Sequence, residues 1–255
     1  MITAANSTPA NLHSNADSTV GIVVALPEEL RTLTNIKLKQ GECIQLGKLL
    51  IAYGGAGMAN AREAAQSLLH KGAKQLVSWG CAAGLAKDLK PGDLLLADKV
   101  VSEQNQFDTD TFWCNHVRQT LQSVVSVHNG RLFTSKDLIS SSLRKYQIQQ
   151  DRQTIALDME SAAIAEVAKE NGMPFLVIRS IADPVTMDLP AAVLAGLNDQ
   201  GQVELPKLLL HLISHPWEIV GLIRLGLHFH AAQKTLKLVA KHLGIQDDQL
   251  SLVAN

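Results

Sequence analysis

Two stretches of the chain decide its fold: Leu157–Ala163 (LDMESAA) and Leu176–Pro184 (LVIRSIADP). The first places Asp158 and Glu160 at the start of a predicted helix, and the second is an apolar strand that ends in Asp183. Acids in the first turn of a helix can simply complement the helix dipole, so Asp158 and Glu160 carry two interpretations. The dipole explanation does not apply to Asp183, because this acid lies at the end of a strand and not at the start of a helix. Buried strands that end in charged residues are typical of ligand sites in α/β proteins.

The composition narrows the class of protein. The chain has 255 residues, of which 46% are apolar, enough for an α/β domain with a full core. A formal net charge of -1 and an aromatic content of 4% argue against a nucleic-acid partner. Cys43, Cys81 and Cys114 are odd in number and far apart, which fits neither a disulfide framework nor a metal site. A reducing cytoplasm is therefore the expected location.

The domain limits follow from where the composition changes. Residues 1–18 are rich in Ala, Asn, Ser and Thr and predict a disordered tail without the features of a signal peptide. Residues 19–255 contain no low-complexity linker and no internal repeat, so we expect a single domain there. Since no run of about 18 apolar residues occurs, we expect no membrane-spanning helix.

Strands followed by helices or glycine turns begin the domain. The first predicted strand, Thr19–Leu26, leads into a helix start that carries Glu29. The second, Lys48–Tyr53, leads into the turn Gly54–Gly57. Glycines there would let a ligand approach backbone amides at a helix start. However, the spacing is not that of a dinucleotide-binding loop, and a plain tight turn explains it as well.

The middle of the chain continues this alternation. The third predicted strand, Gln75–Trp79, ends in a second turn of small residues, Gly80–Leu85. A fourth strand is predicted over Leu94–Val101, followed by a polar loop over Ser102–Thr111 and a helix over Ser135–Tyr146. This order predicts a three-layer α-β-α sandwich around a mixed, largely parallel twisted sheet.

Residues 203–245 depart from the alternation of strands and helices. They predict an apolar helical extension, interrupted at Pro216. They carry more apolar surface than a simple capping helix needs. Packing on the sheet or on a second subunit would explain this surface. A contact with a membrane or with an apolar substrate is the alternative.

The charged residues are expected to meet at one edge of the sheet. Because the carboxyl ends of parallel strands converge, Glu29, Asp158, Glu160, Arg179 and Asp183 should share one pocket with the two glycine turns. Several carboxylates and one arginine favour acid–base chemistry on a polar, sugar-bearing substrate, since ionised carboxylates accept several hydroxyl hydrogen bonds. The chain has neither the G-x-S-x-G turn of a serine hydrolase nor a P-loop.

At these residues the chain resembles the superfamily of purine nucleoside phosphorylases and methylthioadenosine/S-adenosylhomocysteine nucleosidases, over about residues 19–200. Asp158–Ala163 is similar to the ribose-binding motif of that family. Ile181–Asp183 is similar to its strand-end acid motif, and Ala25–Glu29 to the N-terminal motif of the nucleosidases. The two glycine turns lie where the family has its own.

The region after Asp183 resembles one subfamily, the hopanoid-associated nucleoside phosphorylases, through Leu205–Leu209 and His215–Gly226. That resemblance implies removal of adenine from adenosylhopane, which would give ribosyl- or phosphoribosyl-hopane in hopanoid side-chain biosynthesis. The implied alternatives are a soluble methylthioadenosine/S-adenosylhomocysteine nucleosidase and, in another class, a non-catalytic nucleoside-binding module.

The resemblance also implies roles for single residues. Asp183 would protonate N7 of adenine, and Glu29 would orient or deprotonate a water nucleophile or contact the ribose. Glu160 would bind the ribose 2′- and 3′-hydroxyls, Met159 would pack on the ribose, and Arg179 would hold the nucleophile or a phosphate. The purine pocket and the two turns complete the substrate-binding set: Leu138, Ile139, Gly54 and Gly80.

Three departures from the family leave the nucleophile open. The phosphorylases carry an arginine before the second glycine turn, where this chain has Ser78 or Trp79. Gly54 replaces a hydroxyl residue of the nucleosidases, and Ala182 replaces a serine before the acid. Glu29 favours water as the nucleophile, whereas the name of the subfamily implies phosphate as the nucleophile. No cofactor or metal is expected, and phosphate is the one candidate co-substrate.

The expected partners follow from the same resemblance. We expect a lipid-linked nucleoside as the small-molecule partner and a homodimer or higher homo-oligomer. The expected location is cytoplasmic, with peripheral contact at the inner membrane through residues 203–245.

Overall fold

The computed structural model describes residues 19–196 and 205–245. The predicted tail, residues 1–18, lies outside the described residues. The strands are β1 (Val20–Val24), β2 (Cys43–Leu46), β3 (Leu49–Tyr53), β4 (Gln75–Gly84), β5 (Leu94–Val101), β6 (Gln106–Asp108), β7 (Val127–Thr134), β8 (Ala156–Asp158) and β9 (Phe175–Asp183). The helices are α1 (Pro27–Leu30), α2 (Met58–His70), α3 (Thr111–Leu121), α4 (Ser142–Arg152), α5 (Ser161–Glu170), α6 (Ala191–Gly196), α7 (Leu205–Ser214) and α8 (Ile219–His242), with a 3-10 turn η1 (Pro216–Glu218) before α8.

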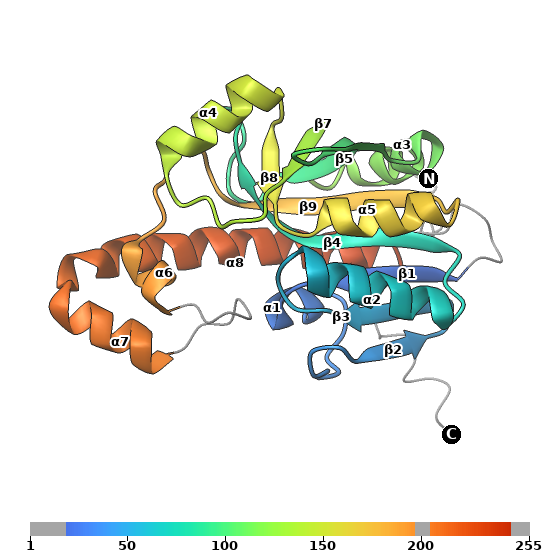
Figure 1. Ribbon diagram of the computed structural model, residues 1–255, viewed down its shortest axis with the longest axis horizontal. Helices are drawn as coiled ribbons and strands as arrows, with labels where there is room; N and C mark the ends of the chain where they lie inside the picture. Colours follow the sequence, from blue (N-terminus) through green and yellow to red (C-terminus); the bar gives the residue numbers. More distant parts are fainter. Residues whose placement is uncertain (1–18, 197–204, 246–255) are drawn as a thin grey trace, which may run out of the picture.

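The strands form one mixed sheet with helices on both faces, as the sequence predicts (Figure 1). β1 pairs in parallel with β3 and β4, and β4 pairs in parallel with β9. Alternate residues of these strands point to opposite faces. Leu76, Val177 and Ile181 pack toward α2 and α5, whereas Val77 and Ile178 pack toward α1, α3 and α8. Two apolar cores therefore lie on the two sides of the sheet, which gives the three layers.

The second half of the sheet closes on itself. β5 pairs in parallel with β7 and antiparallel with β9, while β8 joins β7 to β4. The pairings β4–β8–β7–β5–β9–β4 thus form a ring. The ring brings the ends of β4, β7, β8 and β9 to one place, and it is the framework on which the polar residues described below are held.

Two predicted elements differ from the structure. Gly80–Leu85 was expected as a turn, but β4 continues through Gly84, because these small residues pair with β9 over Gly80–Ala83. Ser135–Tyr146 was expected as a helix, but α4 begins only at Ser142, where the Ser141 hydroxyl accepts the backbone N–H of Arg144. That side chain is a typical N-cap, so it fixes the later start.

The predicted polar loop Ser102–Thr111 also contains an element. β6 occupies Gln106–Asp108 and pairs antiparallel with the end of β5. A short hairpin strand of three residues carries too little periodicity to be recognised in the sequence.

The two halves of α8 have different surroundings. Ala232, Leu236 and Val239 in the second half are fully buried against β9 and β4. The first half, with α6 and α7, projects beyond the end of the sheet (Figure 1). Large apolar side chains that are 59–79% exposed occur here at intervals of three or four residues. We call them the α7–α8 apolar residues: Leu210, Ile213, Trp217, Val220, Ile223 and Leu227. In the described part of the chain, no helix is long and apolar enough to cross a membrane.

Candidate active site

Glu29 is held by backbone amides at the end of β1. Pro27 starts the short helix α1, so the Glu29 side chain turns back toward the strand end and accepts N–H groups of Ala25 at 3.0 Å and Leu26 at 3.1 Å. The other carboxylate oxygen accepts the N–H of Cys81 at 2.8 Å. Burial raises the pKa of Glu29, while Arg179 and these three amides oppose that rise. The result is a fixed, buried carboxyl group.

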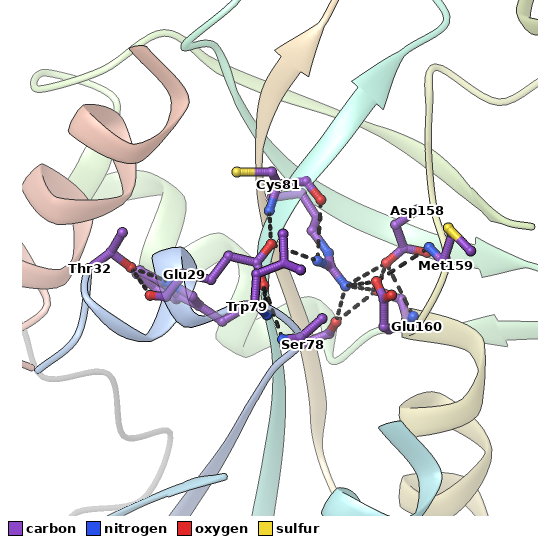
Figure 2. A network of polar contacts seen from close by, with 12 residues as sticks. Glu29, Thr32, Ser78, Trp79, Cys81, Asp158, Met159 and Glu160 are labelled. Carbon is purple, nitrogen blue, oxygen red and sulfur yellow. Dashed lines mark hydrogen bonds and ion pairs between the residues drawn. The ribbon is translucent and has the colours of Figure 1, made fainter. Parts of the chain in front are cut away.

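Arg179 is the centre of a polar cluster. Figure 2 shows its partners Glu29, Asp158 and Glu160. Its Nη2 lies 2.6 Å from Oδ2 of Asp158 and 3.5 Å from Oε2 of Glu160, and its Nη1 lies 3.9 Å from Oε1 of Glu29. Nη2 also donates to the Ser78 hydroxyl at 2.8 Å. Arg179 is 1% exposed. Three buried carboxyl groups therefore share one guanidinium group.

Asp158 has both of the functions that its position suggests. Its Oδ2 accepts the N–H of Ser161 at 3.1 Å, which caps the start of α5, and the same oxygen pairs with Arg179. Its Oδ1 accepts the Thr134 hydroxyl at 2.7 Å. Asp158 is thus a structural ligand of the arginine.

Glu160 faces the opposite glycine turn. Its Oε1 accepts the N–H of Gly57 at 2.9 Å, so the amide next to α2 contacts this carboxyl group. Burial raises the pKa of Glu160 to about 7; Arg179 opposes the rise, and the neighbouring Asp158 adds to it. Glu160 is thus a buried carboxyl group that lies between the Gly57 amide and Arg179.

The glycine at the centre of β4 leaves room for the cluster. A Cβ atom at position 80 would lie 2.3 Å from Oε1 of Glu29 and 2.5 Å from Nη1 of Arg179. Gly80 is therefore required for the approach of these two groups. At the other turn, Gly54 packs closely on Ala64 of α2, so the contact to the cluster comes from Gly57 and not from Gly54.

Asp183 lies at the end of β9 in a separate polar contact. Its Oδ2 forms an ion pair with Nζ of Lys145, a fully buried residue of α4. Burial raises the pKa of Asp183, and Lys145 opposes that rise. Cys81 is near both ends of the site. Burial raises the pKa of its thiol well above the usual value, and the carboxyl groups of Glu29 and Asp183 add to that rise.

The other predicted residues have more varied positions. Met159 is partly buried and adjoins the cluster (Figure 2). Ile139 packs beside the core formed by Leu85, Phe133 and Leu157, whereas Leu138 is exposed. Both precede α4 and so lie on the irregular segment that was expected to be helical.

Sequence reasoning missed several members of the site. Lys145 is the most important. A lysine at an inward position of α4, three residues before the buried Ile148, was a usable signal. Thr134 gave none, because hydroxyl residues are common in strands. Gly57 lies in the predicted turn Gly54–Gly57, and Ser78 was considered only as the position where the phosphorylases carry an arginine.

The arrangement favours carboxylate chemistry. Three carboxyl groups outnumber the single guanidinium, so the cluster is suited to a developing positive charge and unfavourable for a second anion such as phosphate. Within residues 19–196 and 205–245, no group of three or more His, Cys, Asp and Glu side chains is placed to hold a metal ion.

Comparison with known proteins finds a family model and relatives that match this chain. The family model described as the phosphorylase superfamily matches residues 19–204. A 5′-methylthioadenosine/S-adenosylhomocysteine nucleosidase of Buchnera aphidicola is 25% identical over 205 residues, 68% of this chain and 80% of the relative. An aminodeoxyfutalosine nucleosidase of Helicobacter pylori is 25% identical over 199 residues, 64% of this chain and 85% of the relative.

A solved structure has the same fold. It is the Helicobacter pylori MTAN-D198N mutant with 5′-methylthioadenosine in the active site, with a TM-score of 0.64 and 19% sequence identity. The match covers 89% of this chain and 96% of that chain.

Proposed function

The chain belongs to the phosphorylase superfamily and is an enzyme that cleaves N-glycosyl bonds, and from that premise we propose that it hydrolyses an adenine nucleoside with a large apolar 5′ group. The substrate we propose is adenosylhopane, with adenine and ribosylhopane as products. The observation that carries the hydrolytic reaction is the excess of carboxyl groups around Arg179, with Glu29 fixed by three backbone amides.

The reaction uses the two ends of the site differently. Asp183 donates its proton to N7 of adenine while the C1′–N9 bond breaks and its electron pair passes to the base. Glu29 accepts a proton from the water whose oxygen bonds to C1′. Glu160 accepts hydrogen bonds from the ribose hydroxyls, and Met159 packs on the ribose. The carboxylates stabilise the positive charge that develops on the ribosyl group as the bond breaks.

Electrostatics support water as the nucleophile. Nη2 of Arg179 is already engaged by Asp158 and by Ser78. A phosphate bound to Nη2 would have to displace these two partners. It would also enter a buried cluster that contains two further carboxyl groups, Glu29 and Glu160. Like charges in a buried site repel strongly, so phosphate is the less favoured nucleophile.

The α7–α8 apolar residues support the apolar substrate. They lie on elements that come after Asp183 and α6 in the chain. The start of α8 packs near the segment that follows Asp183, since a Cβ at Gly221 would lie 3.0 Å from Pro190. Exposed apolar surface of this kind marks a contact with another molecule. We propose that these residues lie on the inner face of a membrane, from which the lipid part of the nucleoside reaches the site.

A soluble methylthioadenosine/S-adenosylhomocysteine nucleosidase is the second candidate. It is favoured by the relatives, two of which are nucleosidases that the chain matches over about two thirds of its length. The acid–base chemistry is the same in both cases, so the two candidates differ only in the group attached to the ribose 5′ position.

Product analysis tests the proposal. The enzyme is incubated with adenosylhopane in lipid vesicles or with methylthioadenosine, each with and without phosphate, and adenine and sugar products are measured. We expect adenine release from the lipid nucleoside at the same rate without phosphate, and a free ribosyl product. A phosphate requirement would establish phosphorolysis instead, and turnover of methylthioadenosine alone would establish the second candidate.

A surface variant extends the same assay. Trp217→Asp should lower vesicle binding and turnover of the lipid nucleoside at least about tenfold, because it places a charge among the apolar side chains. Leu143→Asp is the matched control, since Leu143 is 66% exposed but lies on α4. Equal effects of the two substitutions would contradict the membrane contact.

A further inference from the structure

Lys145 is an unusual residue for the inward face of a surface helix. α4 is otherwise exposed or partly exposed apart from Ile148, yet the Lys145 side chain has 0% exposure. A buried ammonium group is costly unless its hydrogen bonds are satisfied. The helix therefore contributes a charge to the interior at a position where an apolar side chain would pack more cheaply.

The partners of Lys145 explain its burial. Nζ donates to Oδ2 of Asp183 and to the carbonyl oxygen of Met187 at 2.9 Å, and the carbonyl oxygen of Pro184 lies at 3.5 Å. One ammonium group thus joins α4, the end of β9 and the segment that follows it. Oδ1 of Asp183 forms no hydrogen bond with the described residues, and the Asp183 side chain keeps 12% exposure.

Titratable groups from three elements face Asp183. Lys145 comes from α4, His228 from α8 and Cys81 from β4. His228 is partly buried, burial lowers its pKa, and its Nδ1 atom has no hydrogen-bond partner in the part of the chain that is described. Lys145 is the group in direct contact with the carboxyl group, so it dominates the local field.

We propose that Lys145 is a positioning residue for the general acid: its ammonium group fixes Oδ2 of Asp183, turns Oδ1 toward the purine and stabilises the carboxylate that remains when the proton leaves. This inference rests on the role of Asp183 in the proposed function. When the proton on Oδ1 passes to N7, Asp183 becomes an anion in a nearly closed site. The fixed ammonium neutralises that anion as it forms, which makes the transfer easier.

The pH profile of kcat/KM tests this role. The alkaline limb reports loss of the proton from Asp183. Lys145→Gln removes the charge but keeps a donor for Met187, so the limb should move to higher pH by about 1–3 units, since an adjacent cation normally favours the anion. The maximal rate should fall about 10–100-fold, because the anion is no longer neutralised. Lys145→Arg should keep the limb close to its original position.

Further variants separate the possible outcomes. In an Asp183→Asn background, Lys145→Gln should have no additional effect on adenine release, because Lys145 acts through Asp183. Circular dichroism is measured for each variant to test whether it is folded. Lys145→Met serves as a second uncharged variant. An unshifted limb in both uncharged variants would overturn the inference. Full activity of Asp183→Asn alone would instead overturn the proposed role of Asp183.

Discussion

The two ends of the site contain the same kinds of groups in different ratios. Around Arg179, three buried carboxyl groups share one cation. At the end of β9, Asp183 has a cation of its own in Lys145. The first end therefore has more carboxyl groups than cations, whereas the second has one of each.

The difference matches what each end must do in the proposed reaction. A surplus of carboxyl groups stabilises the positive ribosyl group as the glycosidic bond breaks. Burial raises the pKa of Glu160, and the neighbouring Asp158 adds to that rise. A balanced pair suits a group that must release a proton and accept it again. The surplus costs folding free energy, because buried like charges repel.

The largest effect is expected from removing the shared cation. Arg179→Met leaves Glu29, Asp158 and Glu160 buried without it, so the free energy of unfolding should fall by about 3–5 kcal/mol. Urea denaturation at pH 8 measures this change. Arg62→Met is the control: Arg62 pairs with Glu166 and Glu170 at the surface, where an ion pair contributes about 0–1 kcal/mol. Similar losses in both variants would contradict the comparison.

A smaller effect concerns pH. The pKa of Glu160 rises from 4.5 to about 7 on folding, so between these values the folded state binds more protons than the unfolded state. The free energy of unfolding should therefore fall as the pH rises from about 4.5 to about 7. Glu160→Gln should reduce this fall by about 3 kcal/mol, given about 1.4 kcal/mol for each pKa unit. The measurement is urea denaturation at several pH values.

The control for this prediction is Glu166→Gln, which changes an exposed carboxyl group of α5. It should leave the pH dependence of stability unchanged. If Glu160→Gln and the wild-type protein have the same dependence, Glu160 does not carry the surplus charge.

The smallest effect concerns the support of Glu29. The Thr32 hydroxyl accepts the indole N–H of buried Trp79 at 2.9 Å and donates to the carbonyl oxygen of Glu29 at 2.6 Å. Thr32→Val removes both hydrogen bonds with little change in shape, so stability should fall by about 1 kcal/mol. Thr120→Val, at an exposed hydroxyl on α3, should change it less. Thermal denaturation of the two variants decides whether this anchor matters.

Much of the site could be predicted from local sequence. β5 has the predicted limits, Leu94–Val101, because a continuous apolar run in a buried strand is easily recognised. Glu29 and Glu160 were expected together because each follows a strand, and the structure joins them through Arg179, which lies in the middle of β9. Asp158 was expected at a helix start and does cap α5.

Contacts between distant segments could not be predicted in the same way. The continuation of β4 through Gly84 depends on pairing with β9, about 100 residues later. The burial of Lys145 depends on contacts with Asp183 and Met187, about 40 residues later. A local pattern contains no information on which distant strand or carboxyl group will be met.

The sequence by itself therefore determined the alternation of strands and helices and the set of carboxyl groups at the strand ends, since both depend on short-range periodicity. Only the tertiary structure decided how the charges are shared. The folded sheet brings carboxyl groups that follow β1 and end or follow β8 to Arg179 of β9, and the packing of α4 against the end of β9 gives Asp183 a lysine of its own. The reason is physical: the energy of a buried charge depends on its neighbours in space, and those neighbours are set by packing.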